Sequence, residues 1–198
     1  MTYAIIGSGA IGSAIASQFA RKGIDVLITN RRGPASIADL ARKLGPNITA
    51  GSGGDAVRAD VVVLGVPFGA ASAALREGAE WNGRIVVDAT NAIDFPSFTP
   101  TDLEGRPSSE VVADWVPGAR VVKAFNTLPA AVLALDPAQD GGRRVLFLSG
   151  NDAAANQEIA GLIDRLGFAP IVLGKLREGG RLQQFGGPLI THNLIKKG

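Results

Sequence analysis

Three glycines near the start of the chain have the spacing of a phosphate-binding turn. An apolar stretch, Tyr3–Ile6, predicts a buried strand and runs into a Gly-x-Gly-x-x-Gly motif at Gly7, Gly9 and Gly12. The first glycine can make a tight turn, the second lets the backbone approach a pyrophosphate, and the third lets a helix over Ala10–Lys22 pack on the strand. The free N–H groups at the start of that helix would face the phosphates. We therefore predict a dinucleotide in contact with Gly7, Ser8, Gly9, Ala10, Ile11 and Gly12.

The next strand ends in residues that indicate which dinucleotide is bound. It is expected over Ile24–Thr29, and Asn30, Arg31 and Arg32 follow it. NAD-binding proteins place an acid here to bind the ribose hydroxyls, and that acid would repel a 2′-phosphate. Two guanidinium groups can instead bind a phosphate through paired N–H groups, while the Asn30 amide can still reach the ribose. The sequence therefore predicts NADP(H), with a solvated basic loop as the alternative interpretation.

Polar or aromatic residues also follow three later strands. Ligands of parallel sheets bind at the carboxyl ends of the strands, so we expect these segments beside the dinucleotide. Amide and hydroxyl side chains there can bind the nicotinamide carboxamide, although Asn and Thr are also common turn residues. The cofactor contacts expected at these strand ends are Val66, Pro67, Phe68, Ala89, Thr90, Asn91, Ala124, Phe125 and Asn126.

The titratable side chains leave the catalytic residues unknown. The chain has no cysteine and one histidine, so a thiol nucleophile is excluded and a metal site is not expected. Lys123 lies in an expected strand and could reach either a ligand or an acidic partner. Asp88 is expected to have a structural role. His192 could donate a proton to a reduced acceptor, but a surface or tail-packing position is the favoured interpretation.

Strand and helix signals alternate along the chain, which is typical of an α/β fold with helices on both faces of a mostly parallel sheet. Together with the glycine motif, this predicts a Rossmann-type, doubly wound sheet. Further strands are expected over Asn47–Ala50, Ala59–Val66, Arg84–Asp88, Arg120–Ala124, Arg144–Leu148 and Ala169–Leu173.

Helices are expected between most of these strands. They cover Ala35–Leu44, Gly69–Glu77, a segment that Ser108 opens, Leu128–Leu135, and a segment from Asp152 to Leu166. Asn91–Pro107 and the tail from Lys175 are expected to be irregular. We divide the chain into an NADP-binding Rossmann domain over residues 1–142 and a small C-terminal αβ extension over residues 143–198, which contributes to the acceptor site.

Charge and composition exclude several classes of partner. The 198 residues carry a net charge of +2 with no basic run interleaved with aromatics, so nucleic acid is not an expected partner. Asp60–Ala74 is apolar but too short, and too broken by Gly65 and Pro67, to span a membrane. No charged region precedes the apolar N-terminus, so a signal peptide is not expected. A soluble cytoplasmic protein is the expectation.

On these segments the chain resembles the coenzyme F420-dependent NADP oxidoreductases, also called NADPH:F420 reductases. The same pattern occurs in the cytosolic domain of the six-transmembrane ferric reductases. The most specific segment is Lys123–Thr127, which reads Lys-Ala-Phe-Asn-Thr. The other segments that carry the resemblance are Gly7–Gly12, Asn30–Arg32, Val66–Pro67 and Asp88–Asn91.

The resemblance implies hydride transfer between NADPH and a deazaflavin stacked against the nicotinamide. Such chemistry needs two flat rings held face to face in a dry site, and little acid–base help. The resemblance also implies that the C-terminal segment Gly179–Leu189 helps to position the second ring, and that a homodimer forms through the C-terminal region. A flavin or another small-molecule acceptor in place of the deazaflavin stays open.

Two other functions fit the same NADPH-binding half. One is an NADPH-dependent reductase of a small imine or ketone. The other is a non-catalytic module that binds NADPH and reports its presence to a protein partner. Oxidation of NADPH by an added acceptor separates the enzymes from the sensor.

Overall fold

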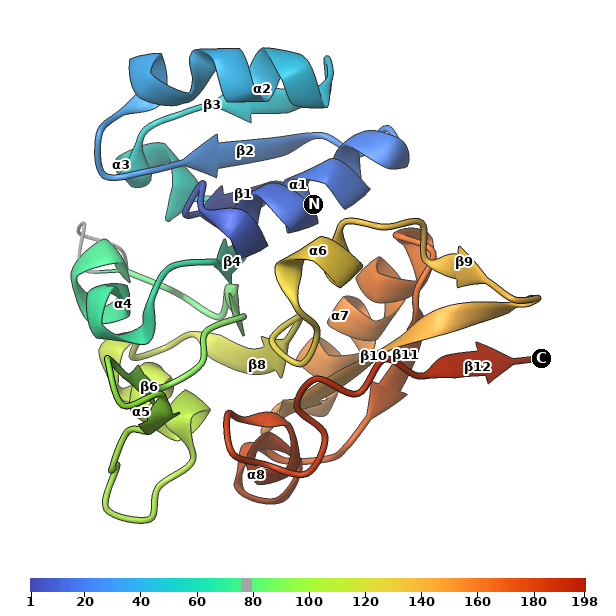
Figure 1. Cartoon of the computed structure of the whole chain (residues 1–198). Coiled ribbons are helices and arrows are strands. Elements are labelled where there is room, and N and C mark those ends of the chain that lie inside the picture. Colours follow the sequence, from blue (N-terminus) through green and yellow to red (C-terminus); the bar gives the residue numbers. More distant parts are fainter. Residues whose placement is uncertain (76–79) are drawn as a thin grey trace.

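Within residues 1–75 and 80–198, which the computed structural model describes, a ten-stranded sheet forms the centre of the protein (Figure 1). Eight of its strands lie side by side in the order β11-β10-β8-β5-β4-β1-β2-β3. Their bounds are Tyr3–Ile6 (β1), Val26–Thr29 (β2), Ile48–Ala50 (β3), Val61–Leu64 (β4), Ile85–Asp88 (β5), Arg120–Ala124 (β8), Gly142–Gly150 (β10) and Ala169–Val172 (β11).

The sheet is parallel except around β10. This strand runs antiparallel to β8 and parallel to β11. Its first residues also pair with β9 (Ala138–Gln139) and β12 (Ile195–Lys197), and these three strands extend to the right in Figure 1. The Rossmann-type, mostly parallel sheet predicted from the sequence is therefore confirmed. The domain boundary at residue 142 stays a prediction, since β10 joins the same sheet as the strands before it.

Helices cover both faces of the sheet because the central strands are apolar on both sides. In β1 and β4, odd-numbered residues such as Ile5 and Val63 belong to one buried cluster, and even-numbered ones such as Ile6 and Leu64 to the other. The first face is covered by α1 (Ala10–Arg21), α2 (Ala38–Leu44), α6 (Ala130–Leu133) and α7 (Ala153–Arg165). The second is covered by α3 (Gly53–Ala56), α4 (Phe68–Leu75) and α5 (Ser108–Trp115).

Most predicted helices are present, with local differences. The helix expected over Ala35–Leu44 is a 3₁₀ turn, Pro34–Ile37, followed by α2. The helix expected over Gly69–Glu77 is described as far as Leu75, and its last two residues lie outside the described residues. Asp152 caps α7, because its side chain accepts a hydrogen bond from the Ala155 N–H.

Two segments expected to be irregular have regular structure. Residues 91–107 contain a small hairpin of β6 (Ile93–Asp94) and β7 (Thr99–Pro100). The tail contains a π-helical turn over Leu176–Gly180, a short helix α8 over Arg181–Gln183, and β12. Two-residue strands are too short to give an alternating pattern, and the tail is ordered by contacts with distant residues.

The glycine motif makes the closest backbone contacts in the fold. Gly7 has a φ of +116°, and a Cβ there would lie 2.2 Å from the carbonyl oxygen of Gly65. A Cβ on Gly12 would lie 1.9 Å from the carbonyl oxygen of Gly7. A Cβ on Gly9, in contrast, would have no neighbour within 4 Å. The protein itself therefore needs the first and third glycines, while the second faces open space.

In the same described ranges, no helix has both the length and the apolar character that crossing a membrane requires.

The buried Gly12 and the exposed Gly9 should respond differently to substitution by alanine. We expect Gly12→Ala to lower the free energy of unfolding by about 2 kcal/mol or more, since the new methyl group overlaps backbone. Gly9→Ala should change it by less than about 0.5 kcal/mol, as is usual at an open surface position. Urea unfolding of both variants measures the difference, and equal losses would contradict the packing described above.

Candidate functional site

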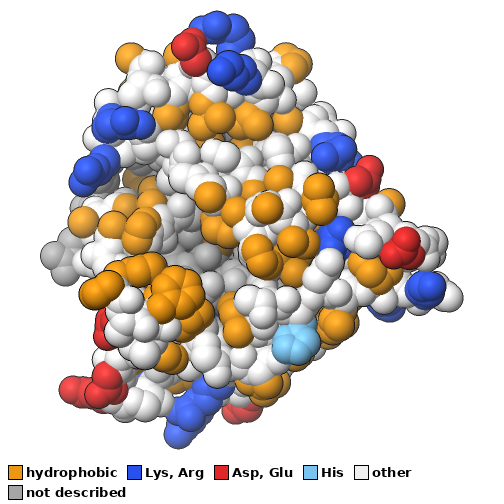
Figure 2. Space-filling view, in the orientation of Figure 1, with side chains coloured by type: hydrophobic (Ala, Val, Ile, Leu, Met, Phe, Trp, Pro, Cys, Tyr) orange, Lys and Arg blue, Asp and Glu red, His pale blue; other side chains and the backbone are white. Residues whose placement is uncertain are grey.

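The strand order reverses between β1 and β4, and this places a crevice at their carboxyl ends. From β1 the chain proceeds outward through β2 and β3, then returns to β4 on the other side of β1. The Gly7 N–H bonds the Thr29 carbonyl at 2.9 Å, and the Gly65 N–H bonds the Ile6 carbonyl at 2.8 Å, so the strand ends are fixed side by side. Ligands of doubly wound sheets bind at such a switch point. Figure 2 shows the surface hollowed near the middle of this face.

The start of α1 is open to an anion from the crevice. Gly9 is its N-cap residue, no side chain caps the helix, and Gly9 and Ala10 are exposed. No acidic residue lies in the first turn to compete for the N–H groups. The positive end of the helix and its exposed N–H groups are therefore free to bind phosphate. Ser8 and Ile11 are half-buried beside them, and Gly12 is buried in the turn.

Asn30 connects the end of β2 to the glycine turn. Its Nδ2 donates to Ser8 Oγ at 3.2 Å and to Ser36 Oγ at 3.0 Å, and its Oδ1 accepts the Arg32 N–H at 2.9 Å. Arg31 and Arg32 are exposed, and neither guanidinium forms an ion pair with any residue that the structure describes. Figure 2 shows basic side chains at the left edge, over the loop that follows β2 in Figure 1.

The residues after β4 lie at the rim of the crevice. Val66 is half-buried and Pro67 is exposed. Phe68 packs on Trp115 of α5 with ring centroids 5.2 Å apart and stays half-buried. Its ring is therefore fixed by a second aromatic residue and still presents one part to solvent.

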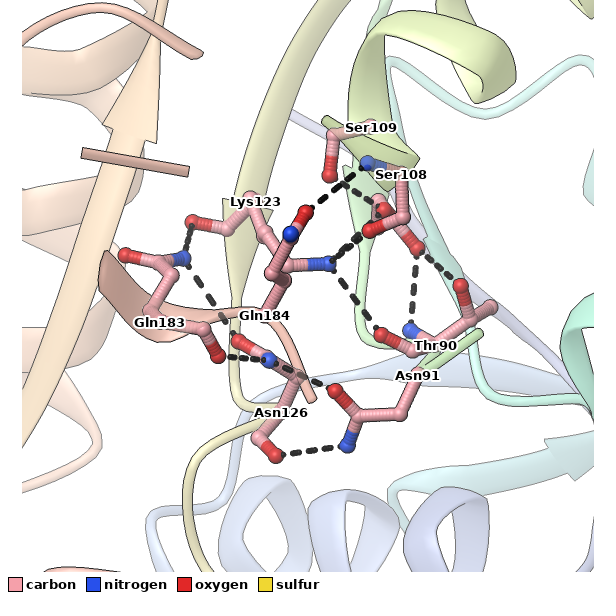
Figure 3. Close-up of polar contacts among 9 residues, drawn as sticks. Thr90, Asn91, Ser108, Ser109, Lys123, Asn126, Gln183 and Gln184 are labelled. Carbon is pink, nitrogen blue, oxygen red and sulfur yellow. Dashed lines mark hydrogen bonds and ion pairs between the residues drawn. The ribbon is translucent and has the colours of Figure 1, made fainter. Parts of the chain in front are cut away.

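A buried ion pair lies beneath the ends of β5 and β8. Asp88 and Lys123 are both fully buried, and Lys123 Nζ donates to Asp88 Oδ2 at 3.2 Å. The same ammonium donates to the Thr90 carbonyl and to Ser108 Oγ, each at 3.2 Å, so all three of its N–H bonds have acceptors (Figure 3). Of the two roles considered for Lys123, the structure shows the acidic partner.

Asp88 is as completely satisfied as its partner. Its Oδ1 accepts the Thr90 N–H at 2.9 Å and the Thr90 hydroxyl at 2.6 Å, and its Oδ2 also accepts the Ser109 hydroxyl. Burial acts to raise the pKa of Asp88, but the Lys123 ammonium and the hydrogen bonds from Ser109 and Thr90 outweigh it and hold the pKa below its usual value. Both groups are thus charged and have no polar atom left for a ligand.

The predicted contacts after β5 and β8 are mostly buried. Asn126 Nδ2 donates to Asn91 Oδ1 at 2.9 Å, and Asn91 Nδ2 donates to the Asn126 carbonyl at 3.0 Å. Asn91 is half-buried, and it is the one side chain of this group that reaches the surface. The side chains of Ala89, Thr90, Ala124, Phe125 and Asn126 are buried. Whether each of them contacts a cofactor stays a prediction.

Beside Asn91, the structure has a cavity that the sequence did not reveal. Its volume is about 560 Å³, and it lies between residues 92–108 and the C-terminal segment; its lining includes Ala92, Arg106, Ser108, Arg181, Gln184 and Phe185. Phe185 continues into an aromatic cluster, since Phe98 lies 5.5 Å from it and Phe95 lies 5.7 Å from Phe98, measured between ring centroids. Phe95 and Phe98 are 70% and 61% exposed.

His192 is exposed on the same face as the hollow (Figure 2). Its Nδ1 lies 3.1 Å from the Ile190 carbonyl, and it makes no contact with the Asp88–Lys123 pair. This surface position agrees with the favoured interpretation of the sequence. The residues that surround the ion pair or hold its neighbours are Ser108, Ser109, Gln183 and Gln184. The sequence predicts Ser108 only as the start of a helix, and the two glutamines only as part of the segment Gly179–Leu189, because polar residues on helices and in a glycine-rich tail carry no pattern that assigns them a site role.

Comparison with known proteins identifies relatives over most of the chain. A family model described as NADP oxidoreductase, coenzyme F420-dependent, matches residues 2–92. The crystal structure of a hypothetical protein, SMa0349 from Sinorhizobium meliloti, is 55% identical with a TM-score of 0.96, over 99% of this chain and 96% of that one. A second crystal structure, provisionally described as an F420-dependent NADP-reductase from Arthrobacter sp. FB24, is 32% identical with a TM-score of 0.74, over 89% of this chain and 86% of that one.

Another relative matches about half of the chain. Human metalloreductase STEAP2 is 31% identical over 94 residues, which are 48% of this chain and 18% of that protein. The match therefore covers less than a fifth of that relative.

Removing the ammonium of the buried pair should give a pH-dependent loss of stability. In Lys123→Met, burial acts on Asp88 without the opposing charge, so its pKa in the folded state rises above that in the unfolded chain. The loss should be about 3–5 kcal/mol near neutral pH and should shrink as pH falls toward about 4, because the carboxyl is then protonated in the folded state and protonation of the unfolded chain begins to catch up. Urea unfolding between pH 4 and 8 measures this.

The double variant Asp88→Asn/Lys123→Met is the control for this titration. It carries no buried carboxyl, so its stability relative to the wild-type chain should be flat between pH 5 and 8. A loss in Lys123→Met that is equally large at every pH would show that Asp88 does not titrate as described.

Proposed function

Because the chain belongs to the family of coenzyme F420-dependent NADP oxidoreductases, we propose that it transfers a hydride between NADP(H) and a flat-ring acceptor, a deazaflavin or a flavin. The dinucleotide would lie across the crevice between β1 and β4. The acceptor would enter the cavity beside Asn91.

One observation carries the proposal. Along the carboxyl ends of the strands, the fold places the exposed basic loop after β2, the open helix start after β1, and the cavity lined by Phe185 beyond β5, in that order. An extended dinucleotide needs a site for phosphate, a site for the ribose and a space for the nicotinamide. Phe185 lines the cavity, and Phe98 and Phe95 extend it into an exposed aromatic surface on which a second flat ring could stack.

The groups of the chain fit NADP(H). The backbone at Gly9 has free space where a pyrophosphate needs to approach, and the start of α1 supplies N–H groups. Arg31 and Arg32 would bind the 2′-phosphate, and Asn30, fixed by its bonds to Ser8 and Ser36, would orient the ribose. Bound NADPH supplies a hydride. The chain's own task is to fix the two rings and to exclude water.

The buried ion pair beneath the nicotinamide end supplies neither an acid nor a base to a ligand, which favours ring-to-ring transfer. Asp88 and Lys123 neutralise one another in the interior, and the Thr90 hydroxyl donates to Asp88. Reduction of an imine or ketone requires a proton at the new N–H or O–H group, whereas a hydride passed to a deazaflavin or flavin leaves a delocalised anionic ring that can take its proton from solvent. We therefore propose a deazaflavin or flavin acceptor ahead of a small imine or ketone.

The arginines should determine the choice between the two dinucleotides. In Arg31→Ala/Arg32→Ala, we expect NADPH affinity to fall by about tenfold to several hundredfold, because one or two charge-assisted hydrogen bonds to the phosphate are lost. NADH affinity should change by less than about twofold. Calorimetric titration measures both, with Arg42→Ala, an exposed arginine on α2, as the matched control. Equal loss for NADPH and NADH would mean that the two arginines are only solvated surface.

The acceptor is tested by mixing the NADPH complex with a deazaflavin, FMN and FAD in a stopped-flow instrument. At least one should oxidise NADPH. In Phe98→Ala the KM for that acceptor should rise by about tenfold, because part of the ring contact is lost. Val172→Ala removes an exposed apolar side chain from β11 and should leave the KM unchanged.

The other outcomes identify the remaining functions. Oxidation of NADPH by small imines or ketones but by no flavin or deazaflavin would favour the imine or ketone reductase. Tight NADPH binding without turnover of any acceptor would favour the sensor.

A further inference from the structure

The turn after β8 contains a strained residue. Phe125 is buried and has a φ of +65°, in the left-handed region that bulky side chains avoid. Such a conformation persists only where the surroundings hold it, and it is common at functional sites. The turn redirects the chain, so that the Asn126 side chain meets Asn91 at the surface.

Gln183 holds this turn from both sides. Its side-chain Nε2 donates to the Lys123 carbonyl at 2.8 Å, before Phe125, and lies 3.5 Å from Asn126 Oδ1, after it. Its main-chain carbonyl accepts Asn126 Nδ2 at 2.6 Å. Figure 3 shows Gln183 bridging the two flanks of the turn. The side chain of Gln183 is fully buried.

The segment that carries Gln183 is itself tightly fixed. A Cβ on Gly179, in the π-helical turn, would lie 2.6 Å from Leu173 Cβ, so this turn is in close contact with the residue after β11. On the other side of Gln183, the Gln184 Oε1 accepts the Ser108 N–H at 3.1 Å. The backbone around Gln183 is therefore fixed on both sides while its side chain holds the turn.

The hydrogen bonds of Asn126 and Asn91 connect Gln183 to the surface of the crevice. Asn126 has two side-chain N–H bonds, and Asn91 Oδ1 and the Gln183 carbonyl accept them, so its amide has none left to donate to a ligand. Asn91 uses one N–H on the Asn126 carbonyl and keeps the other, on a half-buried side chain at the crevice. Gln183 can therefore act on a ligand only indirectly, through its contacts with Asn126 and the contacts of Asn126 with Asn91.

We propose that Gln183 is a positioning residue for the nicotinamide end of the site. It fixes the Phe125 turn and, through Asn126, the direction of the free N–H of Asn91. That N–H binds a planar amide, the chemistry of the nicotinamide carboxamide. The inference rests on the proposed binding of NADP(H), and it adds that a residue of the C-terminal segment controls how firmly the ring is held.

The chain contains a matched control for Gln183→Met. Gln18, on α1, is also buried; its Nε2 donates to the carbonyls of Leu133 and Leu135, each at 2.7 Å. In both glutamines Oε1 has no hydrogen-bond partner. Gln18→Met therefore removes the same kind of bonds from a position that does not touch the strand-end turn.

Three measurements on the full chain separate positioning from structure. For Gln183→Met, calorimetry should give an affinity for 2′,5′-ADP, which lacks the nicotinamide, within about twofold of the wild-type value. NADPH affinity should fall by about fivefold, the effect of one neutral hydrogen bond. The fluorescence lifetime of bound NADPH should shorten toward that of the free cofactor, since the ring is less restrained.

A second variant tests the positioning role within a single protein, so that a difference in stability between variants cannot account for the result. Gln183→Glu preserves the volume and donates a hydrogen bond only while its carboxyl is protonated. Burial raises the pKa of such a carboxyl, so the lifetime of bound NADPH should shorten reversibly as pH rises through that pKa. Gln183→Met should show no such titration.

The outcomes are distinct. If Gln183→Met loses thermal stability as Gln18→Met does, while NADPH affinity and lifetime stay at wild-type values, Gln183 is only structural and the inference is wrong. Equal losses for 2′,5′-ADP and NADPH would also overturn it. Failure of the wild-type chain to bind NADPH would overturn the proposed function, and the inference with it.

Discussion

The buried pair of Asp88 and Lys123 is the interaction on which the acceptor-side half of the site depends. Isolated charges in a protein interior cost several kcal/mol each, and such a pair is tolerated only when its remaining hydrogen bonds are made. Here they are made by Thr90, Ser108 and Ser109. The charges therefore fix β5, β8 and the start of α5 in one relative position, and the loops that leave these elements line the crevice and the cavity.

The phosphate-side half depends on a different constraint, the contact of backbone with backbone. Gly7, Gly12 and Gly65 let the turn after β1, the start of α1 and the end of β4 approach so closely that no side chain fits. This half is built from local sequence and needs no charge. The two halves meet in one crevice, although one is held by van der Waals contact and the other by a buried ion pair.

This difference explains how far the sequence could predict the structure. The glycine turn, the basic loop and the mostly parallel sheet follow from short motifs and the alternation of apolar segments, and they agree with the fold. The hairpin Phe residues, the serines of α5 and Gln183 belong to the site through contacts between residues far apart in the chain. Ser109 and Asp88 are 21 positions apart, and Ser108 and Gln184 are 76 positions apart. No local pattern encodes such contacts. Both amide N–H groups of Asn126 are used within the protein, and contact of this residue with a cofactor stays a prediction.

The pairing of the last strand, β12, with the start of β10 affects how the chain can fold during synthesis. Residues 3–32, which make the phosphate-binding turn and the basic loop, leave the ribosome well before Gln183, at about 5–20 residues per second. The Phe125 turn emerges without the residue that brackets it, and β10 emerges without β12. A nascent chain therefore passes through a stage in which the adenine end of the crevice can already form, while the opposite end still has an unpaired strand edge and a loop free to adopt other conformations.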